Sequence, residues 1–101
     1  MNSHGKGSDR GAALYEALLT LKTPEECYAF FEDLCTVSEQ MAMEQRFEVA
    51  RLLDQGNIYS DVLEKTGVSS ATVSRVKRCL NYGAGGYRLV LERMKTGEET
   101  E

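Results

Sequence analysis

The chain has little of what several common protein classes require. Its 101 residues include no tryptophan, one proline and one histidine. That histidine, His4, lies in the polar, glycine-rich start of the chain. The sequence therefore holds no set of cysteines and histidines with the spacing of a structural zinc site. No apolar run approaches the length of a membrane span, and no signal peptide is visible. We therefore expect a cytoplasmic protein that binds no metal and no membrane.

Reactive side chains are also not grouped in the sequence. The three cysteines, Cys27, Cys35 and Cys79, are an odd number and fall inside helical patterns, so we expect reduced, buried thiols. There is no phosphate-binding loop, and no nucleophile is paired with a base, because the only histidine is in the tail. We therefore expect no enzymatic activity and no resident cofactor.

Charge is distributed unevenly along the chain. The net charge is −4, and residues 1–58 carry 5 basic and 10 acidic side chains. Residues 59–95 carry 7 basic and 3 acidic side chains. Because local charge matters more than total charge for an anionic partner, the segment 59–95 is the one suited to nucleic acid. We expect a disordered tail at 1–8, one domain at 9–95 and an acidic tail at 96–101.

The stretch 59–81 has the pattern of a helix-turn-helix, the motif that places its second helix in the major groove of DNA. Gly67 falls where the first helix must stop, and glycine adopts the left-handed conformation of a helix end without steric cost. Ser69 can cap the second helix by accepting an N–H bond. Val68 and Val73 flank this cap with the spacing of a hydrophobic staple.

The second helix of this motif has two chemically different faces. Val73, Val76 and Leu80 recur at helical spacing, so one stripe is buried. On the other side, small and hydroxyl side chains let a helix approach base edges, and arginines can pair with guanine or phosphate. The predicted DNA-binding residues are Ser69, Ser70, Ala71, Thr72, Ser74, Arg75, Lys77 and Arg78.

Helix-start signals place three helices before the motif. The first runs from about Asp9 to Leu21. The second begins at Thr23, followed by Pro24, and the third begins at Thr36. In both cases a glutamate three residues after the threonine completes a capping box. The face of the second helix that we expect to be buried consists of Cys27, Phe30, Phe31, Leu34 and Cys35.

The third helix is predicted to end at Gly56, and its apolar residues surround its circumference, which favours a central position in the fold. After the motif, a glycine-rich turn at 82–86 precedes a last helix. That helix begins near Tyr87 and has Leu91 and Met94 on one face. The expected fold is therefore all-α, with six helices and no strand.

The run GVSSATVSR, followed by RCLNYGAGGYRLVL, resembles the Trp-repressor-like proteins of the YerC/YecD branch. The match extends from about Asp9 to Lys95, and the segment RCLNYGAGGY is more specific than a general helix-turn-helix pattern. The resemblance implies a six-helix Trp-repressor-like fold and an intertwined homodimer. It also implies that this homodimer binds double-stranded operator DNA and controls transcription.

The resemblance further implies an effector pocket. In Trp repressor, two arginines and a threonine hold tryptophan beside the recognition helix, and Arg46, Arg75 and Thr36 match those positions. Cys79 replaces a serine that bonds the amino group of the ligand. Val76 replaces a glycine against which the indole lies. A valine side chain occupies space that the indole ring needs, which argues against tryptophan as the effector.

Two interpretations of the arginines stay open. In the first, Arg46 and Arg75 hold the carboxylate of some other small ligand. In the second, Arg75 contacts phosphate and Arg46 pairs with a nearby acid such as Glu39 or Glu44.

Two functions from different classes fit these residues. One is a homodimeric transcriptional regulator, expected to act as a repressor, whose paired helices enter successive major grooves. Its phosphate contacts come from Lys65, Lys77 and Arg78, and its base contacts come from Ser70, Ala71, Thr72 and Ser74. The alternative is a helical protein–protein interaction module without DNA binding, whose basic face meets an acidic partner. Salt-dependent binding to duplex DNA distinguishes the two.

Overall fold

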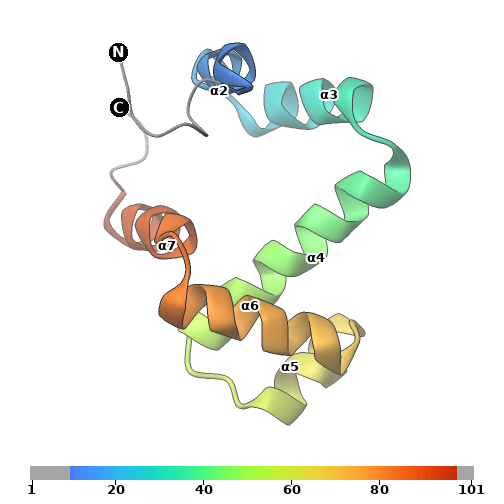
Figure 1. Cartoon of the computed structure of the whole chain (residues 1–101), viewed down its shortest axis with the longest axis vertical. Coiled ribbons are helices and arrows are strands. Elements are labelled where there is room, and N and C mark those ends of the chain that lie inside the picture. The colour runs from blue at the N-terminus through green and yellow to red at the C-terminus, as the bar shows by residue number, and fades with distance from the viewer. Residues whose placement is uncertain (1–9, 98–101) are drawn as a thin grey trace. The chain divides into compact units, whose positions relative to one another are not determined.

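The computed structural model describes residues 10–97, and every regular element in that range is a helix (Figure 1). The helices are α2 (Ala12–Leu18), α3 (Pro24–Leu34), α4 (Val37–Asp54), α5 (Tyr59–Thr66), α6 (Ser70–Tyr82) and α7 (Gly86–Thr96). Six helices and no strand within the described range confirm the predicted all-α fold. The predicted tail at 1–8, with His4, and most of the predicted tail at 96–101 lie outside the described residues.

The chain divides into two compact units, Met1–Gln40 and Met41–Glu101. The first contains α2 and α3, the second contains α5, α6 and α7, and α4 begins in the first and ends in the second. The single domain expected at 9–95 stays a prediction. Within residues 10–97, no helix combines the length and the apolarity that crossing a bilayer requires.

The first helix is shorter than the sequence suggested. Gly11, with a φ of 75°, stands in the left-handed region directly before Ala12, so the helix begins there. After Leu18 the backbone tightens, because the N–H groups of residues 19–21 bond to carbonyls three residues back. Asp9, the predicted first residue, lies outside the described residues.

The two predicted helix starts at threonine are confirmed. The Thr23 hydroxyl accepts a 3.1 Å bond from the Glu26 N–H, with Pro24 in the first turn. The Thr36 hydroxyl accepts an equivalent 3.1 Å bond from the Glu39 N–H, and the Glu39 carboxylate accepts a 2.9 Å bond from the Thr36 N–H. This reciprocal pair satisfies two N–H groups that have no partner within a helix.

The predicted burial of the apolar face of α3 is wrong for the single chain. No residue of α3 is buried, and Leu34 is 50% exposed. Cys27, Phe30, Phe31 and Cys35 are half-buried. The helical spacing shows that this face is apolar, but it carries no information about what covers it.

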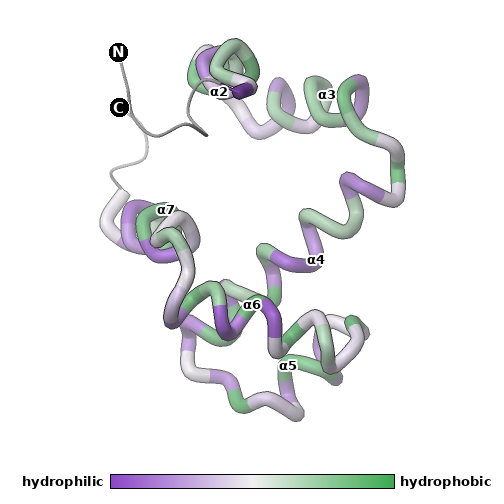
Figure 2. Tube along the Cα trace, viewed as in Figure 1, coloured by the Kyte–Doolittle hydropathy of each residue, from purple (hydrophilic) through white to green (hydrophobic). Residues whose placement is uncertain are grey.

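The core of the Met41–Glu101 unit is built from four helices. Its members are Val49, Ala50, Leu52, Val62, Val73, Val76, Leu80 and Leu91. They come from the second half of α4 and from α5, α6 and α7. The tube in Figure 2 shows hydrophobic and hydrophilic residues alternating along these helices. The first half of α4 is different, since Met41 is 51% exposed. The predicted central position therefore holds only for the second half of α4.

Glycines mark the end of α4 and the start of α7. α4 ends at Asp54, two residues before Gly56, whose φ of 96° is left-handed. α7 begins at Gly86, within one residue of the predicted start. Of its predicted apolar face, Leu91 is buried, whereas Met94 is 49% exposed.

Candidate nucleic-acid interface

The turn between α5 and α6 has the predicted helix-turn-helix geometry. Gly67 has a φ of 71°, and its N–H donates a 2.9 Å bond to the Leu63 carbonyl, which closes the end of α5. Val62 is completely buried and fixes α5 to the core. The helix therefore stops where a residue without a Cβ permits the left-handed backbone.

The predicted cap of α6 is present. The Ser69 hydroxyl accepts a 3.1 Å bond from the Thr72 N–H and lies 3.0 Å from the Thr72 hydroxyl. Val68 is half-buried against the core cluster that contains Val73, as expected for a staple. Because the Ser69 and Thr72 hydroxyls already bond to each other, these two side chains chiefly order the start of α6.

The buried stripe of α6 is also confirmed. Val73 is 0% exposed, Val76 1% and Leu80 7%, so α6 is fixed to the core along its whole length. The opposite side of the helix faces solvent. The exposed residues of the predicted DNA-binding set are Ser69, Ser70, Ala71, Ser74, Arg75, Lys77 and Arg78.

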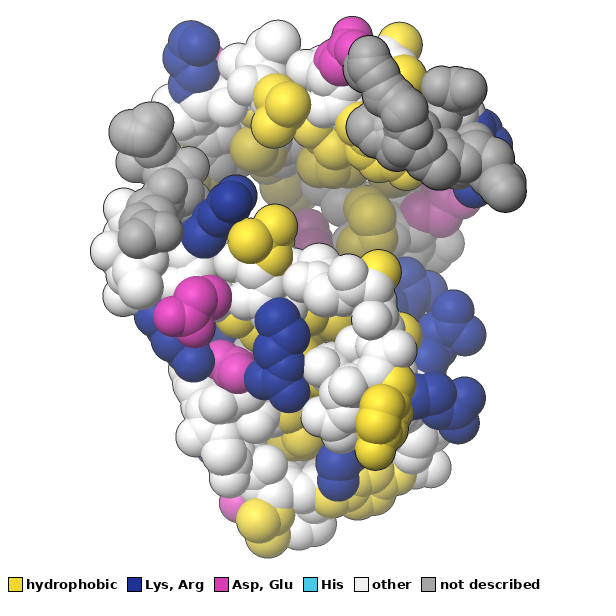
Figure 3. Space-filling model, turned by 60° about the vertical axis from the view of Figure 1, so that its left-hand side comes forward, with side chains coloured by type: hydrophobic (Ala, Val, Ile, Leu, Met, Phe, Trp, Pro, Cys, Tyr) yellow, Lys and Arg dark blue, Asp and Glu magenta, His cyan; other side chains and the backbone are white. Residues whose placement is uncertain are grey.

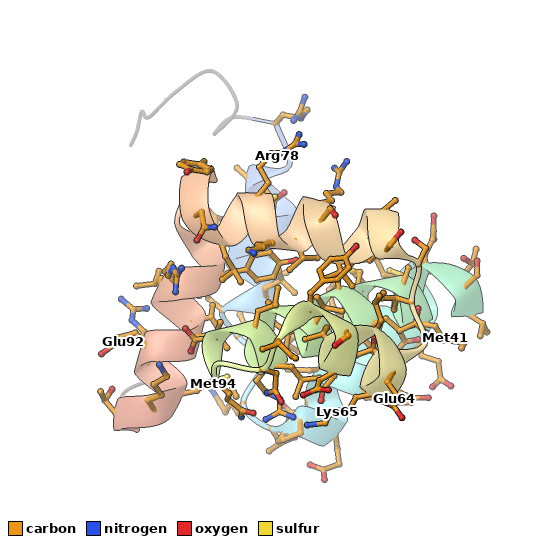
Figure 4. The ribbon with its side chains drawn as sticks, turned by 90° about the horizontal axis from the view of Figure 1, so that it is seen from below. Met41, Glu64, Lys65, Arg78, Glu92 and Met94 are labelled. Atoms are coloured by element: carbon orange, nitrogen blue, oxygen red, sulfur yellow. The ribbon has the colours of Figure 1, made fainter. Side chains whose placement is uncertain are left out.

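The cations of α6 make no ion pair within the described part of the chain. The three ion pairs there join Arg51 to Glu48 and join Arg88 and Lys95 to Asp54. In Figure 4, Arg78 points outward from α6, on the side away from α5. Figure 3 shows Lys and Arg side chains at the right-hand edge of its lower half, with no acidic side chain among them. Cations without acidic partners leave a positive surface available to an anion.

Lys65 does not share this surface. Its ammonium donates a 2.9 Å bond to the Asn57 side chain, and in Figure 4 it lies on the opposite side of the view from Arg78. A DNA duplex lying against the exposed face of α6 would leave Lys65 on the side of the protein that faces away from the DNA. The predicted phosphate contact by Lys65 is therefore not supported.

Two contacts that sequence patterns did not suggest hold the ends of α6. At the start, the Tyr59 hydroxyl donates a 3.2 Å bond to the Ser70 carbonyl. At the end, the Arg88 guanidinium donates a 3.0 Å bond to the Leu80 carbonyl. Both contacts join residues in different helices, so no periodic spacing marks them.

Three of the four predicted effector-pocket residues influence the pKa of Tyr87 electrostatically. Burial raises the pKa of this half-buried phenol, the Cys79 thiol adds to the rise, and the guanidinium groups of Arg46 and Arg75 oppose it. All three side chains therefore act on the same phenol. The expectation of buried thiols is wrong, since Cys79 is exposed, although all three cysteines are free as expected.

The remaining pocket residue, Thr36, belongs to the Met1–Gln40 unit, where its hydroxyl caps α4. The expected pairing of Arg46 with Glu39 or Glu44 is not found among the described residues. Glu39 instead accepts the Thr36 N–H. Within residues 10–97, no group of His, Cys, Asp and Glu side chains is arranged to hold a metal ion.

Comparison with known proteins places the chain in a family. The family model described as Trp repressor protein matches residues 11–95. The uncharacterized protein YerC of Bacillus subtilis is 53% identical over 85 residues, which cover 84% of this chain and 82% of YerC.

Two solved structures are similar in fold and sequence. The TrpR-like protein of Eubacterium eligens superposes with a TM-score of 0.81 at 49% identity, over 86% of this chain and 90% of that one. A candidate Trp repressor of Staphylococcus aureus gives a TM-score of 0.81 at 46% identity, over 92% of this chain and 96% of that one. With six helices in residues 10–97, a capped helix-turn-helix and a family match over residues 11–95, the chain belongs to the Trp repressor protein family.

Proposed function

We propose that this protein binds double-stranded operator DNA as a homodimer and regulates transcription, with α6 as the helix that enters the major groove. The observation that carries the proposal is the exposed face of α6. Arg75, Lys77 and Arg78 are exposed and make no ion pair within residues 10–97, while the opposite stripe is fully packed. A rigid helix with a free cationic face is the arrangement that groove binding requires.

The order of side chains along α6 suits this role. Ser70, Ala71 and Ser74 are exposed near its N-terminus, where a recognition helix approaches base edges. The cations Arg75, Lys77 and Arg78 follow in the middle of the helix, where we expect them to contact phosphates. Base contacts set sequence preference, and phosphate contacts set affinity and its dependence on salt.

The homodimer is proposed from apolar side chains that the single chain leaves exposed. In the Met1–Gln40 unit, Leu34 is 50% exposed and Val37 73%. In the Met41–Glu101 unit, Val90 is 45% exposed beside an open, mainly apolar hollow of about 500 Å³. Phe47 and Tyr87 also line this hollow. Burying such surfaces in a second copy removes apolar area from water and pairs two α6 helices for successive major grooves, roughly 34–36 Å apart.

Tryptophan is proposed not to be the effector. Val76, at the position where the indole would lie, is 1% exposed and forms part of the core. Admitting an indole at this position requires moving a packed side chain of α6. We propose that Arg75 instead contacts phosphate.

The experiment is selection of bound fragments from a genomic library, followed by mobility shifts of the selected duplex at 50 and 200 mM salt. The proposal expects a recurrent, roughly palindromic site, weaker binding at the higher salt, and a dimer by light scattering. Absence of salt-dependent duplex binding at any concentration below about 100 μM, where non-specific binding is normally seen, contradicts it.

A further inference from the structure

Arg88 of α7 makes two contacts at the C-terminal end of α6 and a third with the end of α4. Its Nε donates a 3.0 Å bond to the Leu80 carbonyl, its Nη2 a 3.3 Å bond to the Asn81 side chain, and its Nη1 a 3.2 Å bond to the Asp54 carboxylate. The Lys95 ammonium forms a 2.8 Å ion pair with the other oxygen of Asp54. One guanidinium therefore joins the last residue of α4, the last turn of α6 and the start of α7.

The Leu80 carbonyl has a physical need for this contact. α6 ends at Tyr82, so Leu80 is among the last four residues, whose carbonyls lack a partner within the helix. These carbonyls also carry the negative end of the helix dipole, which a nearby cation stabilises. Only a cationic side chain can supply both the hydrogen bond to the carbonyl and the positive charge at the helix end.

The Asp54 carboxylate makes the contact rigid. Its side chain is only 11% exposed, and a carboxylate so far removed from water requires charged or hydrogen-bonding partners. Arg88 and Lys95 supply them. Moving Arg88 away from α6 would also remove one of the two cations from Asp54, so the three helices are coupled at this point.

We propose that Arg88 is a positioning residue that fixes the orientation in which α6 is presented to DNA. The inference rests on the proposed function. Lys77, one of the proposed phosphate contacts, lines the same hollow of about 430 Å³ as Arg88, Asp54 and Asn81, so a displaced end of α6 carries Lys77 with it. Arg88 acts through α6 and makes no contact with bases.

The guanidinium is specifically required, because its fork of donors reaches three acceptors at once. A lysine keeps the charge and can pair with Asp54, but a single ammonium cannot also span the Leu80 carbonyl and the Asn81 side chain. Arg88→Lys is therefore expected to recover only part of the function that Arg88→Gln loses.

The test compares Arg88→Gln and Arg88→Lys with Arg93→Gln. Arg93 is an exposed arginine of the same helix that makes no ion pair within residues 10–97, so its replacement removes the same charge without the contacts. Fluorescence anisotropy measures affinity for the selected duplex and for a scrambled duplex of the same composition, at several salt concentrations. Hydrogen exchange measures the protection of the last-turn amides of α6 and of the Gly83 N–H, which bonds to the Cys79 carbonyl.

Arg88→Gln is expected to weaken binding to the selected duplex about tenfold, the result of reducing the correctly oriented fraction of α6 to about a tenth. Affinity for the scrambled duplex and the salt slope on both duplexes should change little, and last-turn protection of α6 should fall. Arg88→Lys should lie between Arg88→Gln and wild type, and Arg93→Gln should match wild type. If Arg88→Gln does not fold, Arg88→Lys carries the same comparison.

Three outcomes overturn the inference. Equal behaviour of Arg88→Gln and Arg93→Gln would show that the three contacts have no role in presenting α6. A salt slope that falls by about 1 for each Arg88 removed would show that Arg88 contacts phosphate directly. Unchanged protection of α6 would show that its end is not held by Arg88. Failure of the proposed function looks different, because wild-type protein itself would not bind, and the positioning role in DNA binding would be lost with it.

Discussion

Replacing Arg78 with alanine tests whether α6 meets phosphates. The side chain is exposed, points away from α5 (Figure 4), and makes no ion pair within the described range, so its removal leaves no group without a partner. The free energy of unfolding should change by less than about 0.5 kcal/mol. Any loss of binding then reports on the interface and not on the fold.

The magnitude follows from the charges on α6. A dimer presents Arg75, Lys77 and Arg78 twice, and about six phosphate contacts give a slope of log K against log salt of about −5.4. Arg78→Ala removes two of them, so the slope should become about −3.6. Between 50 and 200 mM salt, wild-type affinity should fall about 2,000-fold and that of the variant about 150-fold.

The assay is anisotropy titration of a labelled selected duplex at four or five salt concentrations. Arg93→Ala, which removes the same charge from an exposed position on α7, is the control and should keep the wild-type slope. If Arg78→Ala leaves both the affinity and the slope at wild-type values, the placement of α6 against the phosphate backbone is wrong.

Four further changes test the packing and chemistry around α6. Ser69→Ala removes the acceptor of the Thr72 N–H and should lower the free energy of unfolding by about 1 kcal/mol in urea titration. Ser69→Asp still offers an acceptor and should keep most of the stabilisation that the cap provides. Gly67→Ala should cost about 1–2 kcal/mol by the same measurement, entirely from its φ of 71°, since no atom lies within 4 Å of an added Cβ. Burial raises the pKa of Tyr87 above its ordinary value of 10.0, so the folded state holds this proton more tightly. Stability is then complete below about pH 10 and falls as pH rises, and Tyr87→Phe should show a smaller fall. Tryptophan at 1 mM should leave DNA affinity unchanged, because Val76 fills the indole position, and a tenfold increase would refute this.

Local signals predicted the helix-turn-helix well. The Ser69 cap, the left-handed Gly67 and the buried Val73 all lie where their residue types suggested. Each depends on atoms within about one helical turn, so its geometry is determined by adjacent residues. The start of α2 at Ala12 differs from the predicted start near Asp9, because no side chain caps this helix and the sequence therefore carries no local start signal.

Other predictions failed because the deciding atoms are distant in sequence. Leu34 lies on an apolar face with regular spacing, yet it is half exposed in the single chain. Cys79 falls in a helical pattern, yet it is exposed. Periodicity identifies which residues share a face, whereas burial depends on which other segment covers that face.

The sequence by itself determined that the chain is helical, where its helices begin and end around α6, and which side of α6 is apolar, because these properties follow from neighbouring residues. Only the tertiary structure decided that Arg88 joins the Leu80 carbonyl to Asp54, a residue 34 positions away, and that Arg46, Arg75 and Cys79 act on Tyr87. Such contacts form when separate helices pack together, and a charged side chain selects its partner from whatever that packing brings within reach.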